Sequence, residues 1–400
     1  MDFQEAVQWL DSRPTPASWR LERMQLLADA TGVDYSRIKF AHVTGSNGKG
    51  SVCAFLDSML RAQGFKTGFY SSPHLVSITE RFRLDNEKIS EEEFAGLAEW
   101  VKPFAEACEA SHFETLTMMA LKFYADSGAE WVVWEVGMGG RLDATNIVTP
   151  AVSVVTGVSI EHAEHLGNTI EAIAREKAGI IKSCAPVVCA CDGEALQVMQ
   201  EKAKEQNTRV VSVEPPSSVA CSRDGTAFAW RASTWQTHLL GDFQALNACT
   251  ALEAALIIGL SEEAMRAGLA DARWPARMDL IGDVLVDGCH NPDGARVFAE
   301  SVNEIFPGEK RLVVGVLADK DCAGVARELA KITGVVECLA VQPDNPRALA
   351  SEKWAAALCA AGLPARASSL DEALAGKGFT VVCGSLYLAG EALKKLNCVV

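Results

Sequence analysis

The sequence predicts an α/β protein of two domains, in which parallel strands alternate with helices. Short apolar runs suited to buried strands recur between longer segments with the helical spacing of apolar residues. A glycine-rich loop joins the first of these strands to the helix after it. The length of 400 residues exceeds what one hydrophobic core usually holds, and two domains are therefore expected.

The N-terminal domain is predicted to span residues 1–270. Apolar runs predict strands at 38–44, 66–72, 131–137, 151–158 and 186–190. Helical spacing predicts helices at 51–64, 168–181, 194–207 and 243–260. The segment 219–240 alternates as strands do. This order of elements favours a parallel sheet with helices on its faces.

The C-terminal domain is predicted to span residues 271–400. The Trp274-Pro275 turn marks the boundary, and after it the strand–helix alternation restarts with VLVDG and a helix from about residue 293. The runs RLVVGVLA, VVECLAVQ and FTVVCGSL predict further strands. We therefore expect a smaller Rossmann-like α/β domain.

Charge and composition exclude several classes of function. The net charge of −15 leaves no general basic surface for nucleic acid. The 13 cysteines include no C-x-x-C pair, which argues against a zinc module or a disulfide scaffold and suits a reducing compartment. The N-terminus lacks a signal-peptide core, and no apolar run reaches membrane-spanning length. We expect a cytoplasmic protein without a membrane partner.

The loop HVTGSNGKGS (42–51) departs from the common phosphate-loop pattern G-x-x-x-x-G-K-[ST]. Val43 stands at the first glycine position, and the hydroxyl comes one residue late, at Ser51. A strand, a glycine turn and a helix nevertheless form the geometry that cradles phosphates with backbone N–H groups, while Lys49 adds a full positive charge. The alternative is a helix cap with glycines in a tight turn. The residues expected to hold ATP or GTP are Ser46, Asn47, Gly48, Lys49, Gly50 and Ser51.

Other polar residues follow predicted strands. Glu135 closes the strand WVVWE, where open α/β sheets place ligand groups, and its carboxylate suits a hard metal ion. The alternative is an acid that merely meets solvent there. Ser72 and His162 follow two other strands, and Lys177 lies in a predicted helix, where a surface lysine is the ordinary interpretation.

The loop pattern T-G-[ST]-N-G-K-G-[ST] is similar to the phosphate loop of the Mur ligase superfamily. Further segments resemble the folylpolyglutamate synthase/dihydrofolate synthase family within it. They follow the family's order, so the resemblance covers almost the whole chain. The segments are SSPHLVSITERFRLDNEKIS (71–90), WEVGMGGRLDATNI (134–147), IEHAEHLGNTIEAIAREKAGIIK (160–182), VDGCHNPDGA (286–295), GVLADKD (315–321) and VVCGSLYLAGEAL (381–393).

The resemblance implies a Mur-ligase-like P-loop domain that binds ATP and folate, followed by a Rossmann-like ligase domain. It implies an ATP-dependent amide ligase that adds L-glutamate to dihydropteroate and to reduced folates. ATP activates the carboxylate as an acyl phosphate, because oxide or hydroxide is a poor leaving group near neutral pH. The expected cofactors are ATP and Mg²⁺, as two ions, and the family suggests a monomer.

The resemblance also assigns residues. Ser72, Glu135 and His162, together with Ser51, match the Mg²⁺ ligands. Lys49, Lys177 and His162 are assigned to catalysis, with Lys177 carbamylated. ATP contacts beyond the loop are assigned to Asn247, Arg277, Asp287 and His290, with Asn291 beside them, and Asp319 and Lys320 either place the amino acid or form a surface ion pair. Folate contacts are assigned to Ser18, Trp19, Arg20, Phe113, Glu114, Leu142, Asp143 and Ala144.

Some positions depart from the family pattern. Relatives commonly carry D-[LF]-G-L-[ED]-R where this chain has Ser18-Trp19-Arg20-Leu21-Glu22-Arg23. The change alters backbone freedom and charge in the folate pocket, and Trp19 could either stack on a pterin ring or pack at the base of the loop. Glu161 replaces the usual Asp, and Cys289 the usual Ala. His165 is expected to be a solvated loop residue.

Three other functions remain open. The first is a synthase that only lengthens the polyglutamate chain, which the altered N-terminal loop would suit. The second is a cell-wall Mur ligase that acts on a UDP-muramyl peptide. The third is a nucleotide-sensing protein without catalysis, which would have no use for Ser72, Glu135, His162 and Lys177 together.

Overall fold

The computed structural model describes residues 1–14 and 20–398. Contacts within the chain define two compact units. Unit 1 comprises Met1–Pro215 and Asn247–Asp271, and unit 2 comprises Pro216–Leu246 and Ala272–Val400. The chain crosses from unit 1 to unit 2 after residue 271, where the sequence predicts a domain boundary. Pro216–Leu246, which lies before that boundary, groups with unit 2.

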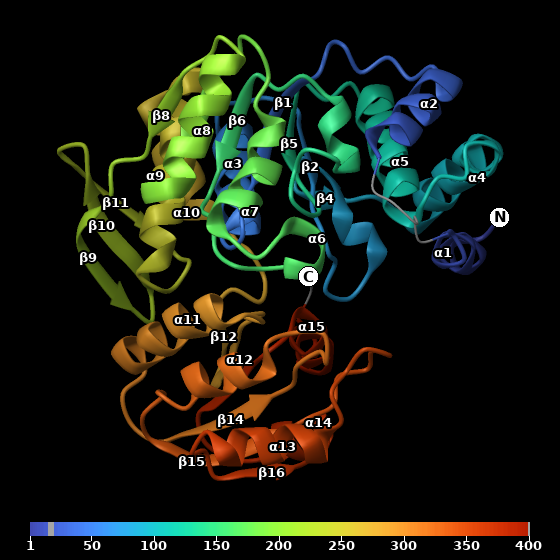
Figure 1. Cartoon of the computed structure of the whole chain (residues 1–400). Helices are drawn as coiled ribbons and strands as arrows, with labels where there is room; N and C mark the ends of the chain where they lie inside the picture. Colours follow the sequence, from blue (N-terminus) through green and yellow to red (C-terminus); the bar gives the residue numbers. More distant parts are fainter. Residues whose placement is uncertain (15–19, 399–400) are drawn as a thin grey trace. The chain divides into compact units, whose positions relative to one another are not determined.

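Unit 1 is built on an eight-stranded sheet in the order β4-β3-β2-β5-β1-β6-β7-β8 (Figure 1). The six strands from β2 to β8 in this order pair in parallel, and β3 and β4 extend the sheet antiparallel at one edge. The strands are β1 (Lys39–Thr44), β2 (Thr67–Tyr70), β3 (Phe82–Leu84), β4 (Glu87–Lys88), β5 (Trp131–Glu135), β6 (Val152–Val155), β7 (Val187–Cys189) and β8 (Val210–Ser212). This sheet confirms the α/β prediction.

The helices of unit 1 bury apolar faces against this sheet. Several begin at capping boxes, in which a side chain and the backbone satisfy each other's groups; Ser90 with Glu93 and Ser111 with Glu114 are two examples. The helices are α1 (Phe3–Asp11), α2 (Leu21–Thr31), α3 (Lys49–Ala62), η1 (Ile78–Arg81), α4 (Glu91–Ala107), α5 (His112–Ser127), η2 (Ala144–Ile147), α6 (Ala163–Leu166), α7 (Ile170–Lys177), η3 (Ala178–Ile180), α8 (Gly193–Glu205), α9 (Phe243–Ile258, from Asn247) and α10 (Glu262–Asp271).

Buried apolar clusters hold unit 1 together. One of them packs α1, α2, α4 and α5 against aromatic residues of the sheet such as Phe40, Tyr70 and Trp134, whose rings contact one another. The other packs α7 and α8 against β6 and β7. Because the apolar side chains of both clusters are almost completely buried, the sheet is a rigid support for the loops at its edges.

Unit 2 contains two sheets. A three-stranded antiparallel sheet in the order β11-β10-β9 is formed by the segment predicted to alternate as strands, 219–240. A six-stranded sheet in the order β12-β13-β17-β14-β15-β16 is parallel except for the β12–β13 pair. The strands are β9 (Ser217–Ser222), β10 (Gly225–Trp230), β11 (Ser233–Thr237), β12 (Asp279–Ile281), β13 (Val284–Val286), β14 (Lys310–Val314), β15 (Val335–Ala340), β16 (Ala365–Ala367) and β17 (Thr380–Cys383).

Five helices accompany the larger sheet, as a Rossmann-like domain requires. They are α11 (Pro292–Ile305), α12 (Cys322–Leu329), α13 (Ser351–Ala360), α14 (Leu370–Ala375) and α15 (Leu386–Lys395). Their core joins Phe298, Leu312 and Trp354, and it also takes in Leu240, which follows the three-stranded sheet. This shared core explains why Pro216–Leu246 belongs to unit 2.

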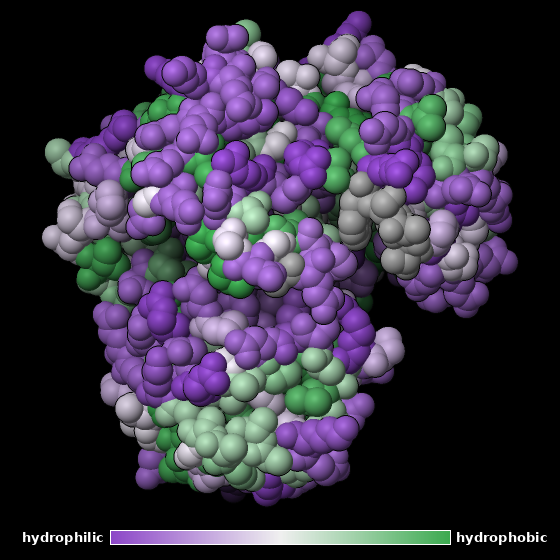
Figure 2. All heavy atoms as spheres, in the orientation of Figure 1, coloured by the Kyte–Doolittle hydropathy of each residue, from purple (hydrophilic) through white to green (hydrophobic). Residues whose placement is uncertain are grey.

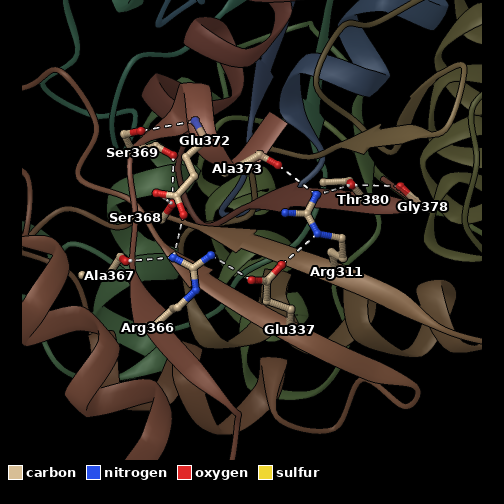
Figure 3. A network of polar contacts seen from close by, with 10 residues as sticks. All are labelled: Arg311, Glu337, Arg366, Ala367, Ser368, Ser369, Glu372, Ala373, Gly378 and Thr380. Carbon is tan, nitrogen blue, oxygen red and sulfur yellow. Dashed lines mark hydrogen bonds and ion pairs between the residues drawn. The ribbon is translucent and has the colours of Figure 1, made fainter. Parts of the chain in front are cut away.

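A polar network crosses the larger sheet at β14, β15 and β16 (Figure 3). The Glu337 carboxylate accepts a hydrogen bond from Arg311 Nε at 2.9 Å and one from Arg366 at 2.9 Å. Arg311 also donates to the carbonyl oxygen of Ala373, and Arg366 pairs with Glu372. The hydrogen bonds to Arg311 and Arg366 outweigh partial burial and lower the pKa of Glu337.

Replacing Glu337 by glutamine is expected to destabilise the protein by about 1 kcal/mol near neutral pH, because two charge-assisted contacts are lost. A carboxylate with a depressed folded pKa stabilises above its unfolded value, and that contribution disappears as the pH falls through the folded pKa. Urea midpoints measured from pH 7 to pH 3 should therefore converge for wild type and E337Q in acid. The control variant E300Q removes the exposed Arg296–Glu300 ion pair on α11 and should change the urea midpoint little. An effect as large as that of E337Q would contradict the stabilising role of the network.

The face in Figure 2 is mainly hydrophilic, with small apolar areas. The large apolar side chains that are exposed among the described residues stand apart in the sequence: Leu26, Val76, Ile160, Leu256 and Val336. In the described part of the chain, none of the helices combines the length and apolar character needed to cross a membrane.

Candidate functional site

Four neighbouring strands of unit 1 bring the predicted site residues to one edge of the sheet. The strands β2, β5, β1 and β6 are adjacent and parallel, so their carboxyl ends share that edge. Ser72 follows β2, Glu135 ends β5, the glycine loop follows β1, and His162 follows β6. In the register, Glu135 lies beside Val43, two residues before Gly45. Open α/β sheets bind ligands at this edge.

Two glycines of the loop, Gly45 and Gly48, occur where a side chain cannot fit. Gly45 has φ 153° and Gly48, which caps α3, has φ 84°. A Cβ at Gly45 would lie 1.9 Å from Thr156 Oγ1, and one at Gly48 would lie 2.4 Å from Asn247 Oδ1. The structure thus brings Asn247 of α9 onto the loop, and its contact with ATP remains a prediction. Close approach of backbone and neighbours is the property a phosphate cradle needs.

The segment after β6 fixes the loop in place. The Ser46 N–H donates to the Gly157 carbonyl oxygen at 2.9 Å, and the Ser159 N–H donates to Ser46 Oγ at 3.0 Å. Thr156 Oγ1 donates to the carbonyl oxygen of Asn47 at 2.6 Å. The loop is therefore shaped before any ligand arrives, which reduces the entropy lost on binding.

Lys49 folds over the loop that it follows. Its ammonium donates to the carbonyl oxygens of Gly45 at 2.7 Å and Ser46 at 3.3 Å. Ser51, in the first turn of α3, is almost completely buried. A cation held at the centre of a glycine loop, with the N-terminus of a 14-residue helix behind it, can neutralise phosphate oxygens.

Glu135 and Ser72 are in direct contact. The Ser72 N–H donates to Glu135 Oε2 at 2.9 Å, and Glu135 is only 4% exposed. The alternative that Glu135 merely meets solvent is therefore wrong. Among the described residues, no three His, Cys, Asp or Glu side chains gather as a metal site. A divalent ion here would therefore need hydroxyl oxygens such as those of Ser72 and Ser51 beside the carboxylate, and such hard oxygens suit Mg²⁺.

The two histidines after β6 are both exposed. His162 has a left-handed backbone, φ 45°, just before the short helix α6. Its role as the third metal ligand remains a prediction. His165, expected to be a solvated loop residue, lies in α6 and lines a cavity of about 80 Å³ with Leu142 and Asp143.

Lys177 is 1% exposed, so the interpretation as a surface lysine is wrong. Its ammonium contacts Glu161 Oε1 at 2.7 Å, and the Glu161 side chain is 9% exposed. Burial lowers the pKa of Lys177 to about 8, although Glu161 opposes the shift. Burial alone would raise the pKa of Glu161, but Lys49 and Lys177 outweigh it and hold that pKa at about 2. Glu161 is thus an anion between the two lysines of the site.

Among the residues predicted to bind folate, several also have structural contacts. Glu114 accepts hydrogen bonds from the Ser111 N–H at 2.7 Å and from Arg23 Nε at 2.8 Å. Phe113 lies next to the Tyr70 ring, with centroids 6.1 Å apart. Arg20 is exposed just before α2, and Ser18 and Trp19 lie outside the described residues.

Asp143 fixes the conformation of the segment GGRLDAT, in which Leu142 and Ala144 are also predicted to contact folate. Its carboxylate accepts hydrogen bonds from the Met138 N–H at 2.9 Å and the Thr145 N–H at 3.0 Å. Burial raises the pKa of Asp143, and these hydrogen bonds oppose the rise. Ala144 begins η2 directly after it. Asp143 therefore shapes the loop, and its contact with a substrate remains a prediction.

Unit 2 places the other predicted nucleotide residues on neighbouring loops. Asp287 follows β13 and accepts hydrogen bonds from the N–H groups of Met278 and Cys289, at 2.9 and 2.7 Å. It thereby ties the segment with Arg277 to the loop with His290. Burial raises the pKa of Asp287, and Arg277 opposes the rise. Contact of these residues with ATP remains a prediction.

Two further residues of unit 2 have structural roles. Asn291 caps α11 by accepting a hydrogen bond from the Gly294 N–H at 2.7 Å. Asp319 forms a surface ion pair with Arg347 at 3.2 Å.

Sequence reasoning assigned no role to three residues of the site: Thr156, Ser159 and Glu161. The first two shape the glycine loop through contacts 109 and 113 residues apart in the chain, which no local pattern reveals. Glu161 could have been found, because a buried lysine requires an anionic partner. The burial of Lys177 was itself visible, since it lies four residues after Ile173 on the apolar face of α7.

Comparison with known proteins agrees with this geometry. Residues 43–255 match the Mur ligase middle domain, and residues 276–382 match the Mur ligase glutamate ligase domain. A dihydrofolate synthase/folylpolyglutamate synthase of Bacillus subtilis is 33% identical over 86% of this chain and 86% of its own length. The chain belongs to the folylpolyglutamate synthase/dihydrofolate synthase family of Mur ligases.

Other members of the family extend the comparison. A probable bifunctional folylpolyglutamate synthase/dihydropteroate synthase of Haloferax volcanii is 34% identical over 98% of this chain, and this chain spans 50% of that relative's length. The solved structure of Escherichia coli FolC in complex with DHPP and ADP has a TM-score of 0.87 and 30% identity, covering 99% of this chain and 98% of that chain. Membership in the family confirms the predicted Mur-ligase-like fold.

Proposed function

We propose that this protein is an ATP-dependent amide ligase that adds L-glutamate to dihydropteroate and to reduced folates through an acyl phosphate. The observation that carries the proposal is the gathering of the glycine loop, Lys49 and the Ser72–Glu135 pair at one edge of one sheet. The names of the family members in Bacillus subtilis and Escherichia coli, dihydrofolate synthase/folylpolyglutamate synthase, support the choice of substrates.

The chain's own groups suit transfer of a phosphoryl group to a carboxylate. Such a step depends mainly on positioning and on neutralising charge. The loop N–H groups and Lys49 would hold the phosphates, with Asn247 beside them. Ser72, Glu135, His162 and Ser51 would hold Mg²⁺, and we propose two ions. Bound Mg²⁺ supplies positive charge to the phosphate oxygens.

We further propose that Lys177 is carbamylated. A lysine reacts with CO₂ only as the neutral amine, and burial that lowers its pKa to about 8 increases the neutral fraction near neutral pH. The product is an anion beside Glu161, so the neighbouring cation Lys49 and bound Mg²⁺ would be needed to balance the charge.

Protein incubated with ¹³C-bicarbonate should show a ¹³C carbamate resonance that is absent from K177M. The matched control K182M changes a half-buried lysine five residues away and should keep the resonance. Electron density for an unmodified Lys177 at full occupancy would contradict the proposal.

The folate end of the site is proposed from Phe113, Glu114, Leu142, Asp143 and Ala144. A synthase that only lengthens polyglutamate is the second candidate, because the N-terminal loop from Ser18 to Arg20 departs from the family pattern. All 13 cysteines are free. That state suits the reducing cytoplasm, and we propose that the protein works there as a monomer.

A substrate panel tests the function. ADP release is measured with ATP and L-glutamate plus dihydropteroate, tetrahydrofolate or a UDP-muramyl peptide. The bifunctional enzyme should respond to the first two. Turnover with tetrahydrofolate alone would support the lengthening enzyme, turnover with the UDP-muramyl peptide alone would contradict the folate proposal, and no stimulated turnover would contradict ligation.

A further inference from the structure

Unit 2 contains an open cavity of about 640 Å³, and of its lining residues the proposed ligase chemistry uses only Arg277. Its walls come from the β9–β10 turn, the end of β11, the segment 273–281 and Cys398. None of these residues belongs to the unit that carries the glycine loop. Cavities of this volume are typical of small-molecule sites.

The walls gather positive charge in a protein whose net charge is −15. Arg223, Arg273 and Arg277 line the cavity, and His238 lies among them. Two carboxylates, Asp224 and Asp279, also line it, and burial raises the pKa of Asp279. The lining is therefore cationic even with the histidine neutral.

Two of these arginines keep hydrogen-bond donors available. Within the described part of the chain, neither Arg223 nor Arg277 forms an ion pair. Arg277 donates to the carbonyl oxygen of Ala276 at 2.9 Å. Arg223 rests on the stacked rings of Phe306 and Phe379, at 5.2 and 5.6 Å from their centroids. Stacking fixes the plane of a guanidinium and leaves its N–H edges for an anion.

A backbone hydrogen bond fixes the orientation of the His238 ring. Its Nδ1 lies 3.1 Å from the carbonyl oxygen of Asp224. A carbonyl oxygen only accepts, so Nδ1 carries the proton and Nε2 remains for another partner. Trp274 and Leu240 add apolar surface to the lining.

We propose that this cavity is a binding site for a small molecule with two or more separated anionic groups. Arg223 comes from the β9–β10 turn, whereas Arg273 and Arg277 come from the segment 273–281, so a ligand with two anionic groups can engage both parts of the lining. Each guanidinium fork matches a carboxylate or a phosphate equally well. The apolar surface beside them would contact the linker between the anionic groups.

Isothermal titration calorimetry on the full chain tests this site, with γ-linked triglutamate and inorganic triphosphate as separate probes. R223M removes the charge and keeps an apolar side chain on the Phe306–Phe379 pair. The matched control is R231M, because Arg231 also belongs to the three-stranded sheet's loops and rests on a ring, that of Trp230, but does not line the cavity. R223M should weaken binding about tenfold, and R231M should not.

If R223M weakens the binding of triglutamate alone, the ligands of the cavity are polycarboxylates. If R223M weakens the binding of triphosphate alone, they are polyphosphates. Either result, or both together, supports the proposed site. Triphosphate binding that is unchanged in R223M belongs to the glycine loop and contradicts the proposed site. The absence of binding by both probes also contradicts the proposed site.

Urea midpoints of R223M and R231M that match wild type show that the fold is intact. If R223M unfolds, R223Q and H238Q replace it, and unchanged binding in both would overturn the proposal. These binding measurements need no turnover, so their failure is distinct from failure of the ligase proposal.

Discussion

Replacing Lys49 by alanine is expected to abolish ligation, with turnover reduced about a thousandfold or more. The Lys49 ammonium is held over the glycine loop by the carbonyl oxygens of Gly45 and Ser46. It is therefore placed to neutralise phosphate charge, which the loop N–H groups alone do only in part. The measurement is ADP release that requires both dihydropteroate and L-glutamate, because basal hydrolysis does not report ligation.

The control for this change is K39A. Lys39 begins β1, the strand that ends in the glycine loop, and its ammonium rests over the Trp131 ring at the other end of the sheet. Removing the Lys39 side chain takes away one positive charge from β1 without touching the glycine loop. K39A should retain activity close to wild type. Activity of K49A within tenfold of wild type would refute the assigned role.

The E135Q variant is expected to need at least ten times more Mg²⁺ for half-maximal turnover. Glutamine keeps the size of the side chain and can still accept the Ser72 N–H, but it lacks the negative charge that a hard cation prefers. The measurement is a Mg²⁺ titration at saturating ATP. Because Glu135 is almost completely buried, thermal unfolding must be compared as well, so that lost activity is not mistaken for lost fold.

E130Q provides the comparison for E135Q. Glu130 directly precedes β5, so it lies at the opposite end of that strand, and its carboxylate accepts a hydrogen bond from the Lys66 N–H at 2.9 Å. E130Q should show the Mg²⁺ titration of the wild type. An unchanged titration in E135Q would exclude Glu135 as a ligand of the metal.

Much of the fold could be predicted because local patterns and long-range packing agree in it. The strand predicted at 38–44 is β1, and the apolar run ending in Glu135 is β5. Both are buried along nearly their whole length, which is what a continuous apolar run means in a parallel sheet. The order of strands in the sheet, however, depends on pairing between distant segments, which no local pattern contains.

The grouping of Pro216–Leu246 with unit 2 shows the same limit. The alternation of this segment predicted strands correctly, yet it did not show which unit the segment packs against. That unit is determined by Leu240 and Phe243, which pack into the core around Phe298 and Leu312. Burial of apolar surface between remote segments therefore overrides position along the chain.

The candidate site divides in a similar way. The glycine loop and Glu135 follow from residue type and position at strand ends, and the structure places both as expected. The surroundings of Lys177 do not follow from the motif, because its ion pair with Glu161 joins residues 16 apart through a turn and a helix. Glu161, one methylene longer than the usual aspartate, reaches this lysine in the folded chain.

The central claim is that the glycine loop with Lys49 holds the triphosphate while Ser72 and Glu135 hold the divalent ion beside it. A crystal structure with a non-hydrolysable ATP analogue and Mg²⁺ measures this directly. We predict triphosphate density along Gly45–Ser51 and a metal ion bonded to a Glu135 carboxylate oxygen. Triphosphate bound elsewhere, with Glu135 and Ser72 away from any metal ion, would contradict the account.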